Sequence, residues 1–201
     1  MAWIRIIPYE SARGRLKKIY DRIKAPSGQI DNILLAHSLR PHTLEGHLSL
    51  YKHVLHNAAN QLPVWFLEAI GVQVSALNNC EYCVEHHKAG LRRALADDQH
   101  WREIISALKS GATEGTFSPK EAALLRYAAA LTVTPSDLSS EIIDGLREDG
   151  ADDGEILEVN QVTAYFAYAN RTVLGLGVTT TGEELGLSPN RTDNENDWQH
   201  H

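Results

Sequence analysis

The sequence predicts an all-α protein, and three observations lead to that fold class. Apolar residues recur every three or four positions along most of the chain, as they do on one face of an amphipathic helix. Proline, glycine and N-capping residues interrupt this pattern at spacings typical of globular helices. No strands alternate with the periodic segments, which argues against a thioredoxin-like frame of alternating strands and helices.

About eight helices are expected after an extended apolar arm at residues 1–9. In the first helix, Leu16, Ile19 and Ile23 share one face, and Pro26 ends the segment. The helical segments fall at about 10–24, 31–39, 43–57, 63–77, 80–95, 101–109, 119–132, 139–150 and 152–175.

Helix starts are marked most clearly by two capping boxes. Ser118 is followed three residues later by Glu121, and Asp152 is followed by Glu155. In each pair the two side chains can satisfy backbone N–H groups that the first turn leaves without partners. Pro63 stands near the start of another segment, where a missing N–H group costs nothing.

Composition limits the domain count and the classes of partner. The 201 residues fit one domain with a sizeable core, and the net charge of −7 argues against nucleic acid or an anionic membrane as partner. No signal peptide or membrane-spanning apolar run is evident. We expect a cytoplasmic protein with one domain, residues 1–180. A polar tail at 181–201 is expected to be loose or to pack on a neighbouring copy.

The only two cysteines form a CxxC motif. On a helix, Cys80, Cys83 and His87 fall within an arc of roughly 60°. Asn78 or Asn79 is expected to cap the helix start, which places both thiols in the first turn, where the helix dipole favours a thiolate. A nucleophilic sulfur, a second sulfur to resolve it and a nearby base form a redox constellation, so a Cys80–Cys83 disulfide is predicted.

These residues belong to a longer pattern, Glu68-x11-Cys80-x-x-Cys83-x-x-x-His87. The pattern resembles the active-site signature of the AhpD-like (alkylhydroperoxidase D) proteins of the carboxymuconolactone decarboxylase superfamily. Flanking segments, Ser38 to Pro41 and Ala164 to Arg171, are similar to its peroxidase-related branch, and the likeness covers roughly residues 5–180. The resemblance implies a helical bundle with the CxxC motif at the start of a central helix. It also implies a homo-oligomer, from dimer to hexamer.

The resemblance implies a thiol-dependent peroxidase that reduces hydroperoxides and is itself reduced by a thiol or lipoyl partner, without a cofactor. Cys83 would attack the peroxide, and Cys80 would donate a proton and then form the disulfide. His87 and Glu68 would relay protons. Where the family's best-studied peroxidases carry a histidine between the cysteines, this chain has Tyr82, which either replaces that histidine as a hydrogen-bond donor or only packs.

Two physical arguments disagree about which sulfur attacks. Cys80 lies nearest the helix start, so we expect it to be the more exposed thiol and, by the dipole, the one of lower pKa. Cys83 lies one turn before His87, where a base can take its proton. A positioned base contributes roughly 10²–10⁴-fold in rate, whereas a helix dipole contributes about 0.3–2 kcal/mol. The prediction therefore assigns attack to Cys83.

The same residues allow three other interpretations. A zinc site lacks a fourth ligand beside the two cysteines and His87, so no metal is expected. A decarboxylase or isomerase activity exists in the superfamily, but those lactone decarboxylases typically lack the CxxC motif. A catalytically weak interaction protein is the last alternative. Five histidines near the N-terminus are interpreted as surface or interface residues: His37, His42, His47, His53 and His56.

Overall fold

The structure is a computed structural model that describes residues 2–194 and 196–199. Its described part is all helical apart from loops and one isolated bridge between Glu114 and Phe117, which confirms the predicted fold class. Nine α-helices are present in the described residues. They are α1 (Gly14–Ile23), α2 (Asn32–Ala36), α3 (Pro41–His56), α4 (Val64–Leu77), α5 (Glu81–Leu95), α6 (Asp98–Ser110), α7 (Pro119–Val133), α8 (Ser140–Glu148) and α9 (Asp153–Leu176). Two short 3₁₀ helices, Tyr9–Ser11 and Pro135–Asp137, complete the set.

Both predicted capping boxes are present, at Ser118 of α7 and at Asp152 of α9. The expected segment at 10–24 is four residues shorter at its start, because Gly14 begins α1 in a left-handed conformation that follows extended backbone at Arg13. Pro63 is the N-cap residue of α4 and lies just outside the helix.

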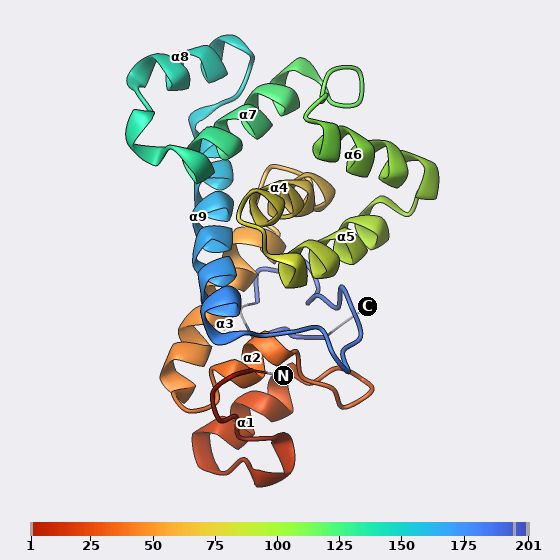
Figure 1. The fold of residues 1–201 in the computed structure, drawn as a ribbon, viewed down its shortest axis with the longest axis vertical. Coiled ribbons are helices and arrows are strands. Elements are labelled where there is room, and N and C mark those ends of the chain that lie inside the picture. The colour runs from red at the N-terminus through yellow and green to blue at the C-terminus, as the bar shows by residue number, and fades with distance from the viewer. Residues whose placement is uncertain (1, 195, 200–201) are drawn as a thin grey trace.

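Helix α4 is the centre of the fold, and α5, α7 and α9 pack around it (Figure 1). It is apolar on nearly all sides, as expected for a helix buried within a domain. Its one buried charged side chain is Glu68. Gly71 lets α9 approach closely, since a Cβ atom there would lie 2.3 Å from the ring of Phe166.

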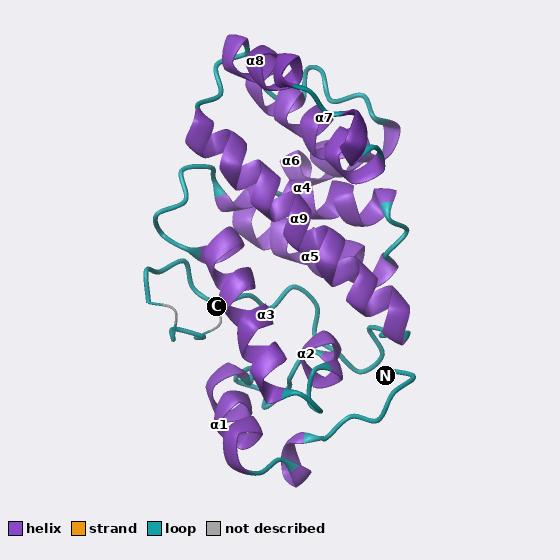
Figure 2. Ribbon diagram, turned by 90° about the vertical axis from the view of Figure 1, so that its left-hand side faces the viewer, coloured by secondary structure: helices purple, strands orange, loops and turns teal. Residues whose placement is uncertain are grey.

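A second layer, formed by α1, α2 and α3, lies at the opposite end of the molecule from α7 and α8 (Figures 1 and 2). Leu16, Ile19 and Tyr20 of α1 pack with Leu44 and Leu48 of α3 in their own apolar cluster. The N-terminal arm is anchored by backbone contacts: the N–H of Trp3 donates to the carbonyl of Leu176 over 2.8 Å.

The C-terminal segment is defined here as residues 179–199. The prediction that it forms a loose tail or packs on a neighbouring copy is wrong. Its described residues fold back over their own chain and run between α5 and the α1–α3 layer (Figure 1). Trp198 is 6% exposed and joins the apolar cluster of α1 and α3. The tail residues 195, 200 and 201 lie outside the described residues.

Within the described residues, no helix combines the length and apolar character needed to cross a membrane.

The close contact at Gly71 gives a stability prediction with a matched control. We expect Gly71→Ala to lower the free energy of unfolding by about 1–3 kcal/mol, since the new methyl overlaps the Phe166 ring. Gly46→Ala in α3 meets open space and should instead raise stability by about 0.5–1 kcal/mol, because alanine loses less backbone entropy. Denaturant unfolding of both variants measures the difference, and equal effects would contradict the packing at Gly71.

Candidate functional site

The turn between α4 and α5 positions the two thiols. Asn79 adopts a left-handed conformation, φ 56°, and the N–H of Cys80 donates to the carbonyl of Ser75 over 2.8 Å. Cys80 is itself the N-cap residue of α5, and Cys83 lies in the first turn. The expected asparagine cap is wrong, because Asn78 is the C-cap residue of α4 and its amide donates to the Asn170 side chain.

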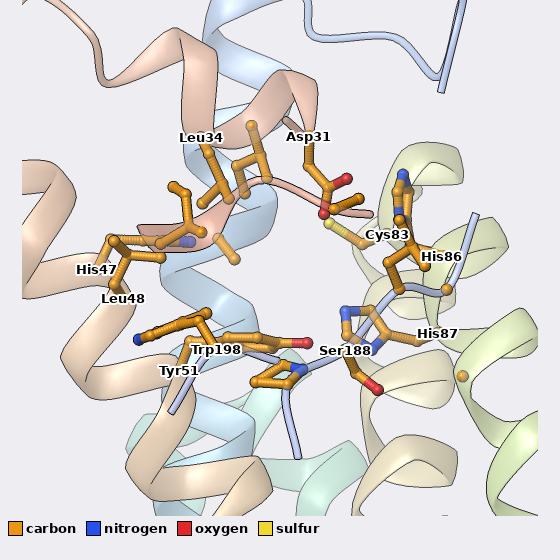
Figure 3. A pocket seen from close by; sticks show the side chains of 18 of the residues that line it. Asp31, Leu34, His47, Leu48, Tyr51, Cys83, His86, His87, Ser188 and Trp198 are labelled. Carbon is orange, nitrogen blue, oxygen red and sulfur yellow. The ribbon is translucent and has the colours of Figure 1, made fainter. Parts of the chain in front are cut away.

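The thiols differ in what they face. Both are buried, with Cys80 fully so and Cys83 3% exposed, so the prediction that Cys80 is the more exposed thiol is wrong. Cys83 lines a cavity of about 60 Å³, and Cys80 does not. Figure 3 shows Cys83, His86 and His87 on one side of this pocket, opposite His47, Leu48 and Trp198. A molecule in the pocket therefore meets the sulfur of Cys83.

The two sulfurs share a proton. The Cys83 thiol and backbone N–H, together with Asn170, favour negative charge on Cys80 and lower its pKa to about 7 despite burial. The same contact and burial raise the pKa of Cys83. The direction expected from the helix dipole is thus present, but its first cause is the neighbouring thiol. When the pair loses its first proton, near pH 7, the charge therefore lies on Cys80 and the remaining proton on Cys83.

A buried carboxylate lies beside His87. Glu68 is 2% exposed, and its Oε2 lies 2.6 Å from Nδ1 of His87. Its Oε1 lies 3.9 Å from Nε2 of His56, which in turn lies 3.0 Å from the hydroxyl of Tyr51. Gly90 makes room for the carboxylate, because a Cβ atom there would lie 3.0 Å from it. Glu68, His87 and Cys83 all line the pocket, so a proton can pass among them through a bound molecule or water.

Two of the five histidines interpreted as surface residues are buried instead. His47 is 4% exposed and His56 is 2% exposed. Burial lowers the pKa of His47 to about 3 and that of His56 to about 4, so both rings are neutral near pH 7. The nearest acidic residue in sequence, Glu45, lies two positions from His47 and 11 from His56. Neither spacing is the three or four that brings side chains together on a helix, so no local signal marked these histidines as site residues.

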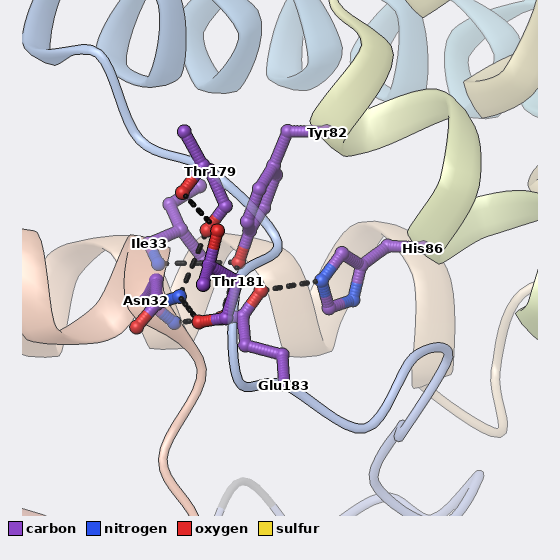
Figure 4. A network of polar contacts seen from close by, with 7 residues as sticks. All are labelled: Asn32, Ile33, Tyr82, His86, Thr179, Thr181 and Glu183. Atoms are coloured by element: carbon purple, nitrogen blue, oxygen red, sulfur yellow. Dashed lines mark hydrogen bonds and ion pairs between the residues drawn. The ribbon is translucent and has the colours of Figure 1, made fainter. Parts of the chain in front are cut away.

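A second polar network surrounds Tyr82, and its carboxylate comes from the C-terminal segment (Figure 4). The Tyr82 hydroxyl donates to Oε1 of Glu183 over 3.0 Å, and Oε2 of Glu183 lies 3.0 Å from Nε2 of His86. The backbone N–H groups of Asn32 and Ile33 donate to Glu183 and Tyr82 respectively. Tyr82 is therefore a hydrogen-bonding member of the pocket wall as well as a packed ring.

Asp31 also lines the pocket. Burial raises the pKa of its carboxyl to about 6, with Glu183 and Glu184 adding to the rise and His86 opposing it. Neither Asp31 nor Glu183 was identified from the sequence, because they lie 52 residues before and 100 residues after Cys83 with no motif around them.

The C-terminal segment is held over the pocket by cations that bind its backbone or the loops below it. The buried Lys52 donates to the carbonyl of Asn190, and Arg93 donates to the carbonyl of Gly186. Arg191 of the segment donates to the carbonyls of Asn57 and Asn60. Gly186, Leu187, Ser188 and Pro189 then form one wall of the cavity.

No group of three or more histidine, cysteine, aspartate or glutamate side chains within the described residues is arranged to hold a metal ion.

The lowered pKa of Cys80 predicts how the two thiols titrate. We expect reduced protein to show one thiolate, by ultraviolet absorbance, with a midpoint near pH 7. Cys83→Ala removes the main group that favours the Cys80 thiolate, so the midpoint should move up toward the ordinary thiol value of about 8.5. If Cys80→Ala keeps the midpoint near 7, the thiolate belongs to Cys83 and the assignment is wrong.

A pair of glycines tests the closure of the pocket. A Cβ atom at Gly186 would lie 2.6 Å from the Cβ of Ala89 in α5, whereas one at Gly182 meets nothing within 4 Å. Both glycines have positive φ, so both alanine variants carry similar backbone strain. We expect Gly186→Ala to push the segment off α5 and to speed maleimide labelling of Cys83 several-fold, measured by mass spectrometry. Gly182→Ala should label at the wild-type rate, and equal labelling of the two variants would contradict the closure.

Comparison with known proteins finds a family match over just under half of the chain. Residues 41–130 match the model of the carboxymuconolactone decarboxylase family. No curated protein sequence matches the chain.

Three solved structures share the fold. A peroxidase-related protein of Ralstonia eutropha with an alkylhydroperoxidase AhpD core has a TM-score of 0.73 and 20% identity, over 89% of this chain and 91% of its own. A peroxidase-related protein of Silicibacter sp. has a TM-score of 0.70 and 22% identity, over 88% and 87%. The debrominase Bmp8 has a TM-score of 0.67 and 19% identity, over 82% and 85%. The match of residues 41–130 to the carboxymuconolactone decarboxylase family model includes Glu68, Cys80, Cys83 and His87, and the chain shares the helical fold of AhpD-like, peroxidase-related proteins.

Proposed function

We propose that this protein is a thiol-dependent peroxidase that reduces hydroperoxides through the Cys80–Cys83 pair. The observation that carries the proposal is that Cys83, Glu68 and His87 line one pocket. The carboxylate of Glu68 lies 2.6 Å from the His87 ring, which is the geometry of a proton relay. The CxxC motif supplies the second sulfur that a redox cycle needs.

The attacking sulfur is Cys83, because Cys80 does not reach the pocket. At rest the proton lies on Cys83 and the charge on Cys80, so the proton first crosses to Cys80. The Cys83 thiolate then attacks the outer peroxide oxygen, the O–O bond breaks, and the leaving alkoxide takes the proton from Cys80. The products of this step are an alcohol and a sulfenic acid on Cys83.

The second step closes the disulfide. The Cys80 thiolate attacks the sulfur of the sulfenic acid, and the departing hydroxide takes a proton from His87 to form water. Glu68 then passes a proton from solvent back to His87. A thiol or lipoyl reductant supplies the two electrons and two protons that return the disulfide to thiols. Such a reductant is consistent with a reducing, cytoplasmic location.

The roles are tested by stopped-flow oxidation with ethyl hydroperoxide and hydrogen peroxide, with free thiols counted before and after. We expect Cys83→Ser to be inert and Cys80→Ser to trap a sulfenic acid that dimedone labels. Glu68→Gln and His87→Gln should slow oxidation by roughly 10²–10⁴-fold, the usual contribution of a positioned acid or base. His53→Gln, on the exposed side of α3, serves as control and should match wild type.

The same measurements separate this proposal from its rivals. If Cys83→Ser consumes peroxide at the wild-type rate while Cys80→Ser does not, the two roles are reversed. If no variant and no wild-type sample loses thiols, the redox function itself is wrong. A decarboxylase or isomerase activity on cyclic acids, or a catalytically weak interaction protein, would then be favoured.

A second candidate is thiol-dependent removal of a halogen. Its support is that one structural neighbour is a debrominase, which also has a structure with bound 2,3,4-tribromopyrrole. The aromatic rings of Tyr51, Tyr165 and Trp198 in the pocket wall suit a flat substrate. Release of bromide from that compound, dependent on Cys83 and without peroxide consumption, would favour this candidate over the first.

Assembly into a homo-oligomer, dimer to hexamer, remains a prediction from the superfamily. Exposed apolar side chains offer contact surface for it, including Trp3, Val133 and Leu157.

A further inference from the structure

The pocket holds two polar atoms whose hydrogen bonds are missing. Four buried side-chain polar atoms in the described residues have no hydrogen-bond partner, and two of them, Nε2 of Gln29 and Nδ1 of His47, belong to residues that line the Cys83 pocket. Buried polar atoms in folded proteins are nearly always paired. Two such atoms in the wall of one cavity therefore point to a ligand that completes them.

The proposed relay uses neither residue. Gln29 lies in the loop between α1 and α2, and His47 lies in α3, whereas Glu68 and His87 lie in α4 and α5. Figure 3 shows His47 with Leu48 and Trp198 across the pocket from Cys83. A ligand whose reactive end meets Cys83 would thus direct its other end toward His47.

The charges around the pocket determine which chemical groups the His47 end of the ligand can carry. No lysine or arginine is among the described residues that line it, whereas Asp31 and Glu68 are acidic. The His47 ring is fully buried and remains neutral near pH 7. A carboxylate or phosphate would find no cation here, while a neutral oxygen can accept from the Gln29 amide and pair with the His47 ring.

The size of the cavity limits the ligand further. About 60 Å³ accommodates roughly four water molecules, which corresponds to a few non-hydrogen atoms with the C-terminal segment closed. The apolar side chains of Leu34, Leu48 and Trp198 favour carbon between the two polar ends.

We infer that the pocket recognises a small, uncharged organic substrate with a hydroxyl or carbonyl oxygen remote from its reactive group, and that Gln29 and His47 bind this oxygen. The inference rests on the proposed function and names its substrate class: hydroxyalkyl or oxoalkyl hydroperoxides in preference to plain alkyl or carboxylated ones.

Matched substrates test it. 2-Hydroxyethyl hydroperoxide and propyl hydroperoxide have the same number of non-hydrogen atoms, and the comparison extends to 3-hydroxypropyl and butyl hydroperoxide. Each kcat/KM is divided by the rate constant of the same hydroperoxide with free cysteine, which corrects for intrinsic reactivity. We expect this corrected kcat/KM of wild type to be at least about tenfold higher for the hydroxylated member, because buried polar groups reject an analogue that leaves them unpaired.

The ratio of kcat/KM for the hydroxylated hydroperoxide to that for the plain one should fall to near unity in His47→Leu and in Gln29→Leu. His47→Asn, which keeps a polar atom close to the position of Nδ1, should recover part of it. His53→Gln in the same helix is exposed and should keep the wild-type ratio. Far-ultraviolet dichroism confirms that each variant is folded, and Gln29→Leu provides an independent test where His47→Leu does not fold.

A peroxide-free measurement separates this inference from the proposed function. Iodoacetamide is neutral and iodoacetate is an anion, and mass spectrometry gives the rate at which each alkylates Cys83. We expect a strong preference for iodoacetamide that shrinks in His47→Leu and Gln29→Leu. That result without any hydroperoxide reduction refutes the peroxidase and leaves the pocket chemistry standing. The inference is wrong if both variants leave the ratio of the iodoacetamide rate to the iodoacetate rate unchanged, or if wild type prefers iodoacetate.

Discussion

The burial of one carboxylate shapes the rest of this structure. Glu68 stands in the middle of the most apolar helix, 2% exposed, where an unpaired charge would be strongly unfavourable. It persists because His87 of α5 faces it at 2.6 Å and because Gly90, one turn later, leaves space for its oxygens. The pairing of α4 with α5 is therefore both the core of the fold and the source of the Glu68–His87 contact. The cysteines occupy the turn that joins those two helices.

The two thiols differ both in pKa and in whether they face the pocket. Cys80 receives the contacts that favour a thiolate, while Cys83 faces the pocket. In an isolated thiol, low pKa and exposure usually go together at a reactive site. Here the pKa is lowered at Cys80 and raised at Cys83, so the thiol that faces the pocket is the one that holds its proton. Because the thiolate is the form that oxidants attack, a protonated Cys83 reacts more slowly with them.

Local signals predicted the fold class, most helix limits and the four motif residues. Capping boxes, prolines and apolar spacing act within one or two turns, so Ser118 and Asp152 were identified correctly. The rest of the pocket depends on contacts between distant segments. Asp31 and His47 share the pocket wall, and Glu183 reaches His86, only because segments distant in sequence pack together, and no pattern within a helix turn reports that. The tail was misjudged for the same reason: its polar composition suggested solvent, but its backbone carbonyls are bound by Lys52 and Arg93.

The position of the C-terminal segment has a consequence for how such proteins diversify. The portion that matches the family, residues 41–130, contains Glu68, both cysteines and His87. Much of the cavity wall comes from outside that portion, from Gln29 and Asp31 on one side and from Leu187 and Trp198 on the other. Substitutions in these outer segments can change which molecule reaches the sulfur without disturbing α4 and α5. The outer segments thus supply part of the cavity wall that can vary while the four motif residues are kept.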